Sequence, residues 1–157
     1  NIKGSEVFSL DAAVMSQYST LTTLYLSKNF IQEIHHKNCF GLRTLLRLFL
    51  DRNRLYRVDL TCFIHTPALQ ELNLAHNELT LDNQSFPHLP NLTNLKLEDL
   101  ELLDISEDHF SFLSKLKIVY FHTFRYCSYV PKVPQCLPNF DGKKPLSCSM
   151  IFSASQL

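Results

Sequence analysis

Apolar residues recur along the chain at a nearly constant interval of 23 or 24 residues. The first apolar column contains Leu21, Leu45, Leu69, Leu92 and Leu116. Three residues later stand Leu24, Leu48, Leu72, Leu95 and Val119, and two beyond those stand Leu26, Leu50, Leu74, Leu97 and Phe121. Alternation of apolar and polar residues is typical of a strand that turns one face to the core. The pattern therefore predicts one short strand in each unit.

Two further columns complete the unit. An asparagine stands eight residues after each of the first three unit starts: Asn29, Asn53 and Asn77. We expect these amides to form a ladder that satisfies backbone groups where the chain turns inward. The other column contains Met15, Cys39, Phe63, Phe86 and Phe110, which we expect to pack under the outer, convex side.

This spacing is the leucine-rich repeat pattern L-x-x-L-x-L-x-x-N-x-L. A single repeat cannot bury its apolar edge alone, so neighbouring repeats must stack. The sequence therefore predicts an α/β solenoid, a leucine-rich-repeat horseshoe with short parallel strands on the concave face and a Cys-containing C-terminal cap.

The period also predicts how the chain is divided. Residues 1–121 form the repeats: a partial repeat at 1–20, and full repeats that begin near 21, 45, 69, 92 and 116. Residues 122–142 form the cap or hinge, and 143–157 a flexible tail. Because Leu100 and Phe124 replace the asparagine, the ladder is expected to stop after Asn77. The chain opens without Met or an apolar signal core, so we expect a piece of something larger.

The cap contains closely spaced cysteines. Cys127 and Cys136 enclose a small loop, and a bridge between them is the favoured connectivity. A Cys127–Cys148 bridge is the competing one. A cystine-stapled segment is a common way to close an exposed last repeat.

The cap carries a more specific resemblance. The residues that show it are Val119-Tyr120-Phe121, Phe124-Arg125-Tyr126-Cys127-x-Tyr129-x-Pro131 and Cys136-x-Pro138-Asn139-x-Asp141-Gly142. This run resembles the segment that joins the repeats to the first membrane helix in relaxin-type receptors, which are G-protein-coupled receptors. From Lys143 onward the tail departs from that pattern.

The resemblance implies a function and a location. The repeats would bind a peptide hormone of the insulin/relaxin type on the concave face. The cap would couple the repeats to a seven-helix membrane domain of the parent chain and, through it, to a G protein. The chain would lie on the extracellular side of the plasma membrane. Two alternatives are a secreted leucine-rich-repeat binding or matrix protein and, less favoured, a cytosolic adaptor.

Candidate ligand-binding residues lie at outward positions of the expected strands. They are Tyr25, Phe49, Asp51, Glu71, Asn73, Glu98 and Asp99. Exposed aromatic side chains often carry binding energy. The acids match the residue type that relaxin-type receptors are understood to use against hormone arginines, although Arg47, Arg52 and Lys96 interleave with them. The alternative is that these charges only solvate an open face.

Composition narrows the remaining function classes. The formal net charge is zero, which gives no field for nucleic-acid binding. Three glycines could hardly build a phosphate loop, and no catalytic motif is present, so we expect neither an enzyme nor a cofactor. Asn83-Gln84-Ser85 and Asn91-Leu92-Thr93 are candidate glycosylation sites and favour an extracellular location.

A histidine and cysteine cluster raises the question of metal binding. His35, His36 and Cys39 are close in sequence, and Cys62 and His65 follow in the next repeat. Zinc sites need several convergent ligands, and Cys39 occupies an apolar column, so we expect no metal. We expect free thiols rather than a Cys39–Cys62 disulfide, because the two cysteines are out of column by one residue.

Overall fold

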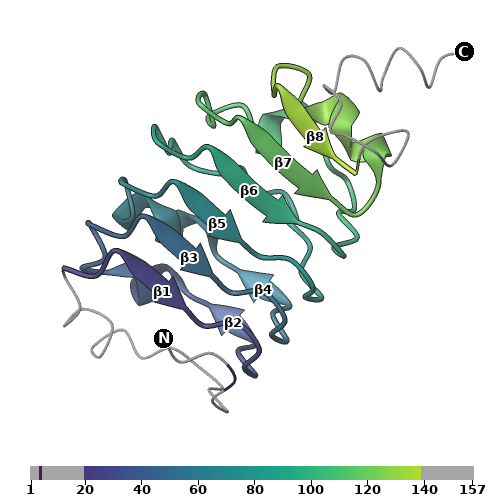
Figure 1. The fold of residues 1–157 in the computed structure, drawn as a ribbon. Coiled ribbons are helices and arrows are strands. Elements are labelled where there is room, and N and C mark those ends of the chain that lie inside the picture. The colour runs from purple at the N-terminus through teal and green to yellow at the C-terminus, as the bar shows by residue number, and fades with distance from the viewer. Residues whose placement is uncertain (1–3, 5–19, 139–157) are drawn as a thin grey trace, which may run out of the picture.

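The computed structural model describes Gly4 and residues 20–138, and these form a single curved stack of parallel strands (Figure 1). The strands of the long sheet are β1 (Thr23–Tyr25), β3 (Arg47–Phe49), β5 (Glu71–Asn73), β6 (Asn94–Leu97), β7 (Ile118–Phe121) and β8 (Gln135–Leu137). They lie side by side in the order β1-β3-β5-β6-β7-β8, each parallel to the next. The solenoid expected from the repeat is therefore confirmed.

Strand register follows the sequence columns. Leu24 pairs with Leu48, Leu48 with Leu72, Leu72 with Leu95, and Leu95 with Val119. Every member of this column is at most 7% exposed. The single residue missing from the third repeat falls after its strand, so the register is kept across the shortened unit.

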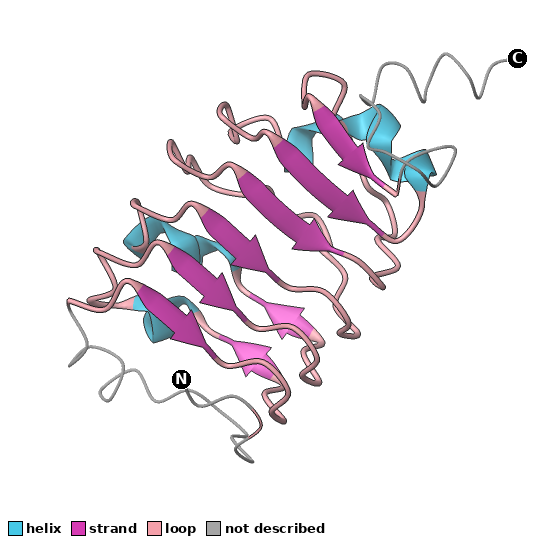
Figure 2. Cartoon of the chain, in the orientation of Figure 1, coloured by secondary structure: helices cyan, strands magenta, loops and turns pink. Residues whose placement is uncertain are grey.

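Short helices and a small sheet form the opposite side of the stack, as Figure 2 shows. The helices are of the 3-10 type: η1 (His36–Cys39), η2 (Leu60–His65), η3 (Glu107–His109) and η4 (Phe124–Tyr129). The small parallel sheet joins β2 (Glu33–Ile34) to β4 (Arg57–Val58). Stretches of 3-10 helix are short because their hydrogen-bond geometry is poor, which suits a return path of few residues.

The core lies between these two layers and runs the length of the stack. Phe63 and Phe86 are fully buried and Phe110 is 5% exposed, as the aromatic column predicted. The rings of Phe86 and Phe110 stack with centroids 6.0 Å apart, and Phe121 meets Phe110 edge-on at 5.8 Å. Phe86, Phe110 and Phe121 thus form an aromatic spine through the last three repeats.

The asparagine ladder is present at the end of the strands. Asn53 Nδ2 donates to the carbonyls of Leu26, Leu50 and Asp51, and its Oδ1 accepts from the amide of Ile31. Asn77 repeats the arrangement one unit further on. In the next unit Leu100 occupies this column and is 1% exposed.

The cap covers the last repeat and also adds a strand to the long sheet. Its segment Gln135–Leu137 pairs with β7 as strand β8 and extends the sheet, which the sequence did not predict. Cys127 in η4 is bridged to Cys136 in β8, with a Cα–Cα distance of 6.0 Å. This is the connectivity that the sequence favoured; the competing partner, Cys148, lies outside the described residues.

Candidate binding surface

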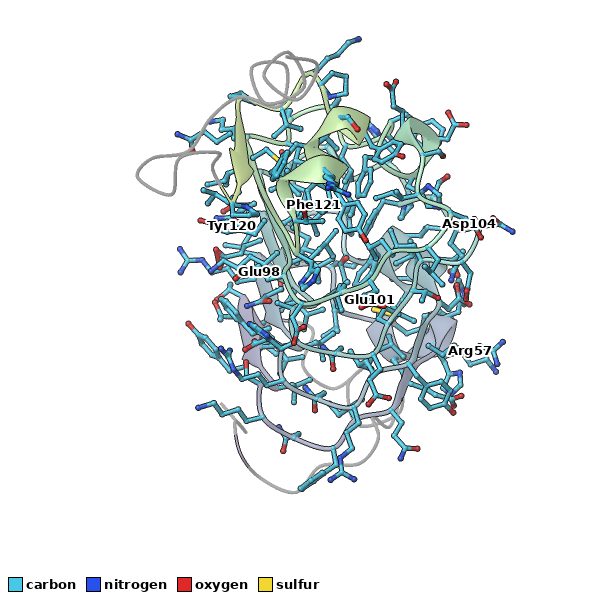
Figure 3. All side chains as sticks on the ribbon, turned by 90° about the vertical axis from the view of Figure 1, so that its right-hand side faces the viewer. Arg57, Glu98, Glu101, Asp104, Tyr120 and Phe121 are labelled. Carbon is cyan, nitrogen blue, oxygen red and sulfur yellow. A yellow bond between two sulfur atoms is a disulfide. The ribbon has the colours of Figure 1, made fainter. Side chains whose placement is uncertain are left out.

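The outer face of the long sheet carries two parallel rows of side chains, a central row and a row before it. The central row contains Tyr25, Phe49, Asn73, Lys96, Tyr120 and Leu137. The row before it contains Thr23, Arg47, Glu71, Asn94, Ile118 and Gln135. Figure 3 shows Tyr120 and Glu98 on this side of the molecule, with Phe121 turned toward the interior. The strand alternation therefore presents every second side chain to solvent.

Two of the aromatic candidates meet at one end of the central row. The rings of Tyr25 and Phe49 have centroids 4.6 Å apart and are nearly parallel, with an interplanar angle of 6°. Both side chains are half-buried. Parallel in-register strands place the two rings opposite one another, and the stacked pair forms one flat apolar surface.

A second aromatic group stands at the other end of the row. Lys96 Nζ lies 5.1 Å from the centroid of the Tyr120 ring, a cation–π contact. Tyr120 is not among the seven candidate ligand-binding residues named from the sequence. The signal was present, because Tyr120 falls in the same column as Tyr25 and Phe49.

Asp51 is nearly buried and is bonded to side chains of this chain. Its side chain is only 8% exposed. Ser27 Oγ donates to Asp51 Oδ1 at 2.6 Å, and Arg52 Nη1 donates to Oδ2 at 2.9 Å. A ligand cation would have to displace these partners, so the structure gives Asp51 a role in fixing neighbouring strands.

Asn73 is similarly engaged within the sheet. It is 9% exposed, and its Oδ1 accepts a hydrogen bond from the Ala75 amide at 3.0 Å. The neighbouring Ala75 is 2% exposed. In the middle of the central row, β5 therefore presents the nearly buried Asn73 between the two aromatic groups.

The remaining acidic candidates occupy different settings. Glu71 and Glu98 are half-buried on the outer face. Asp99 follows β6 in the left-handed conformation, with φ of 54°, and its side chain is 66% exposed. His76 Nδ1 lies 3.3 Å from Asp99 Oδ2. Asp99 is thus a turn residue at the rim, not a residue of the strand face.

The convex side contains a disulfide that the sequence argued against. Cys39 and Cys62 are bonded, with a Cα–Cα distance of 5.3 Å, and both are almost fully buried. The expectation of free thiols is wrong for these two residues. Cys39 ends η1 and Cys62 lies within η2. The two cysteines are one residue out of column, but the turns of these neighbouring helices bring their side chains together.

On the convex side, polar side chains that belong to none of the predicted columns also connect neighbouring repeats. Gln84 Oε1 accepts from the Leu60 amide, and Gln84 Nε2 donates to the Val58 carbonyl one repeat earlier. His109 Nδ1 accepts from the Ser106 amide at 3.0 Å within its own repeat, and His109 Nε2 lies 3.2 Å from the Asp82 carbonyl oxygen of the preceding repeat. No periodic column marks these residues, so the repeat pattern could not identify them.

The asparagines of the two candidate glycosylation sites lie at the surface. Asn83 and Asn91 are both exposed, as a glycosylated asparagine must be.

Between the last repeat and the cap lies a hollow of about 380 Å³, whose lining includes Leu116, Tyr129 and Lys132. Across Gly4 and residues 20–138, no helix has the length and apolar character needed to cross a membrane.

Together, the sheet, the ladder and the spine define a leucine-rich repeat solenoid. Residues 19–79 match the family model of the leucine rich repeat. Chaoptin of Drosophila melanogaster is 34% identical over 119 residues, covering 74% of this chain and 8% of chaoptin. Transforming growth factor beta activator LRRC33 of Danio rerio is 31% identical over 116 residues, covering 64% of this chain and 17% of that protein.

A solved structure agrees in fold. The crystal structure of a TLR13–ssRNA13 complex superimposes with a TM-score of 0.65 at 24% identity, over 72% of this chain and 17% of that chain. At this identity the likeness concerns the solenoid alone. The chain spans less than a fifth of the length of either curated relative, so the functions of the whole proteins do not follow from the match.

Proposed function

We propose that this chain is a protein-binding solenoid of an extracellular protein, and that its ligand binds on the outer face of the long sheet. The observation that carries the proposal is the pair of aromatic groups at the two ends of the central row, Tyr25 with Phe49 and Tyr120 with Lys96. Aromatic residues are enriched among the residues that dominate binding energy.

The spacing of these groups suits a folded peptide. Phe49 and Tyr120 lie on strands three steps apart, or about 14 Å at the usual strand separation. About ten residues of α-helix cover that length, so one amphipathic helix could contact both groups. Glu71, Glu98 and Lys96 between them would set its charge preference. A peptide hormone of the insulin/relaxin type, implied by the cap resemblance, fits this description.

The proposed extracellular location is supported by two disulfide bonds. Two disulfides, Cys39–Cys62 and Cys127–Cys136, are part of the fold. Structural disulfides persist in oxidising compartments and are rare in the cytosol. The two exposed sequons at Asn83 and Asn91 support the same location, which we propose to be the extracellular side of the plasma membrane.

Alanine substitution of the aromatic residues tests the binding face. Phe49→Ala and Tyr120→Ala are each expected to weaken binding of an insulin/relaxin-type hormone about 10-fold or more, because each removes an anchor ring. Surface plasmon resonance on the 157-residue chain measures the affinity, and thermal melting shows whether the fold is intact. Tyr56→Ala is the matched control, since Tyr56 is an exposed tyrosine outside the long sheet. Equal affinity in all three variants would remove the outer face from the proposal.

We further propose that the cap relays occupancy to a seven-helix domain of the parent chain and, through it, to a G protein. The support is the cap resemblance and the position of Tyr129 and Lys132 at the hollow beside the last repeat. Tyr129→Ala and Lys132→Ala in the parent chain are expected to reduce signalling at normal surface expression and unchanged hormone affinity. If they lower only expression, the cap merely closes the core.

The alternative is a secreted leucine-rich-repeat binding or matrix protein without a membrane domain. The tail from Lys143, which departs from the receptor pattern, favours it. The parent transcript separates the two: seven apolar segments downstream indicate the receptor.

A further inference from the structure

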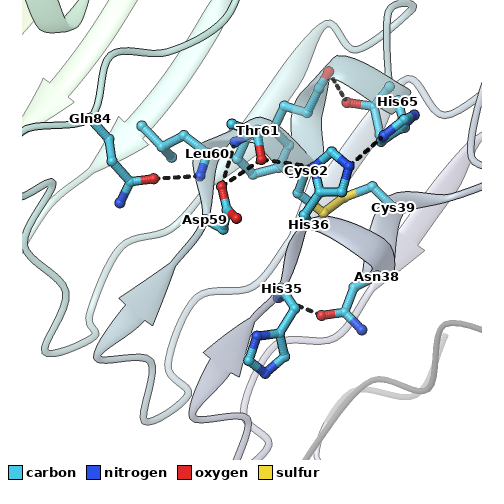
Figure 4. The surroundings of a disulfide bond; sticks show 12 residues. His35, His36, Asn38, Cys39, Asp59, Leu60, Thr61, Cys62, His65 and Gln84 are labelled. Carbon is cyan, nitrogen blue, oxygen red and sulfur yellow. Dashed lines mark hydrogen bonds between the residues drawn. A yellow bond between two sulfur atoms is a disulfide. The ribbon is translucent and has the colours of Figure 1, made fainter.

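The convex disulfide places two histidines side by side. His36 precedes Cys39 by three residues in η1, and His65 follows Cys62 by three residues in η2. In a 3-10 helix, residues three apart lie on the same face. Each helix therefore presents its histidine on the face where the disulfide joins it to its neighbour (Figure 4).

The two imidazoles are in direct contact. His36 Nε2 and His65 Nε2 lie 3.3 Å apart. Both side chains are half-buried. The Phe40 ring packs edge-on against each of them, with centroids 5.4 Å from His36 and 4.6 Å from His65. The pair thus has an apolar wall on one side and remains reachable from solvent.

A hydrogen-bonded chain fixes the tautomer of His36. The Thr61 hydroxyl donates to Asp59 Oδ1 at 2.6 Å, so Thr61 Oγ1 must accept from His36 Nδ1, which lies 2.8 Å away. His36 Nδ1 therefore carries the proton, and Nε2 keeps a lone pair directed toward His65. Hydrogen bonds from Thr61 are the main reason that the pKa of Asp59 lies below its ordinary value, so the chain ends on a carboxylate.

Such a chain is the arrangement found behind metal-binding histidines. There, the ring nitrogen that does not bind the metal donates to a polar partner, which orients the ring and raises its basicity. Two imidazole nitrogens bound to one tetrahedral ion, each at about 2.05 Å, are separated by about 3.3 Å. The distance between the two Nε2 atoms therefore already equals the distance between two nitrogen ligands of one tetrahedral ion.

We propose that His36 and His65 form a binding site for a divalent transition-metal ion of imidazole preference, such as Zn²⁺ or Cu²⁺. No group of three or more His, Cys, Asp or Glu side chains suited to a metal converges within the described part of the chain. In this proposal the two imidazoles are the protein ligands, and water would fill the other coordination positions. His65 binds through Nε2 with its proton moved to Nδ1. Neutral imidazole suits Zn²⁺ and Cu²⁺ better than it suits Ca²⁺ or Mg²⁺.

Isothermal titration of the metal-free 157-residue chain with ZnCl₂ and with CuCl₂ tests the site. The expected result is one ion per chain, with affinity reduced about 10-fold or more in His36→Ala and in His65→Ala. Thr61→Val, which removes only the outer partner, is expected to weaken binding about 10-fold. His35→Ala is the matched control. The His35 ring is next to His36 in sequence, but it points away from the pair in Figure 4 and contacts Glu33 instead.

Two results would overturn the proposal. One is the absence of binding by the unmodified chain up to millimolar ion. The other is binding that survives both histidine substitutions, which would place the ion at another of the seven histidines. Circular dichroism checks folding, and His65→Gln serves as the second variant if the alanine variant unfolds. Because Phe49 and Tyr120 lie on the opposite side of the stack, hormone binding and metal binding can fail independently.

Discussion

Replacing Phe86 with alanine is expected to lower the free energy of unfolding by about 4 kcal/mol, as for large aromatic residues in packed cores. Phe86 is fully buried and stacks on Phe110, which in turn contacts Phe121. The substitution opens a cavity in the core of the stack, where the repeats on both sides are held by their own strands and cannot collapse into it. Urea unfolding followed by circular dichroism measures the loss.

Phe112→Ala is the control for this substitution. Phe112 is of the same type and lies in the same part of the chain, but its side chain is 56% exposed. We expect its replacement to change stability by less than about 0.5 kcal/mol. Similar losses in the two variants would show that the spine is not a packed core.

The repeat period was sufficient to predict most of the fold. Each step of 23 or 24 residues places one leucine beside the next in a parallel sheet, so the columns and the strand register carry the same information. The ladder followed for the same reason, since an amide repeated once per unit must meet the same backbone groups each time. The identity of the ladder residues, Asn29, Asn53 and Asn77, was therefore predictable without coordinates.

Features that break the period were not predictable. Cys39 and Cys62 are 23 residues apart where their columns require 24, and only the geometry of two short helices shows that they meet. Strand β8 has no leucine pattern of its own; it pairs with β7 and is tied to η4 through Cys136. Ser27 and Asp51 stand in the same column, 24 residues apart, but the column alone does not show that the two side chains bond to each other and leave Asp51 almost buried.

The proposed binding face shows the same difference between what the repeat period predicts and what contacts between repeats decide. Position along a strand predicted which side chains point outward, and Tyr25 and Phe49 do so. Which of the outward charges are available depends on contacts between repeats, because a carboxylate with internal partners is already compensated. Glu71 and Glu98 therefore remain stronger candidates than Asp51 for contact with a basic ligand.

Asn77→Ala is expected to destabilise the chain by about 3 kcal/mol, because it removes hydrogen bonds from several backbone groups at once. Asn77 Oδ1 accepts from the amides of Asn53 and Leu55. Its Nδ2 donates to the carbonyls of Leu50, Leu74 and Ala75, at 3.0–3.1 Å. These groups belong to two adjacent repeats, so the loss should reduce cooperativity as well as stability. Urea unfolding monitored by both circular dichroism and tyrosine fluorescence measures the two effects.

Two further variants separate the roles of the amide. Asn77→Asp keeps the accepting oxygen but turns a carboxylate oxygen toward the three carbonyls, so at neutral pH we expect it to be at least as destabilising as alanine. Asn94→Ala is the control, because Asn94 stands on the sheet and its Oδ1 accepts no hydrogen bond from the described residues. Its replacement is expected to cost less than about 0.5 kcal/mol. If Asn77→Asp were instead as stable as the unmodified chain, the donated hydrogen bonds would contribute little, and the acceptor side alone would hold the ladder.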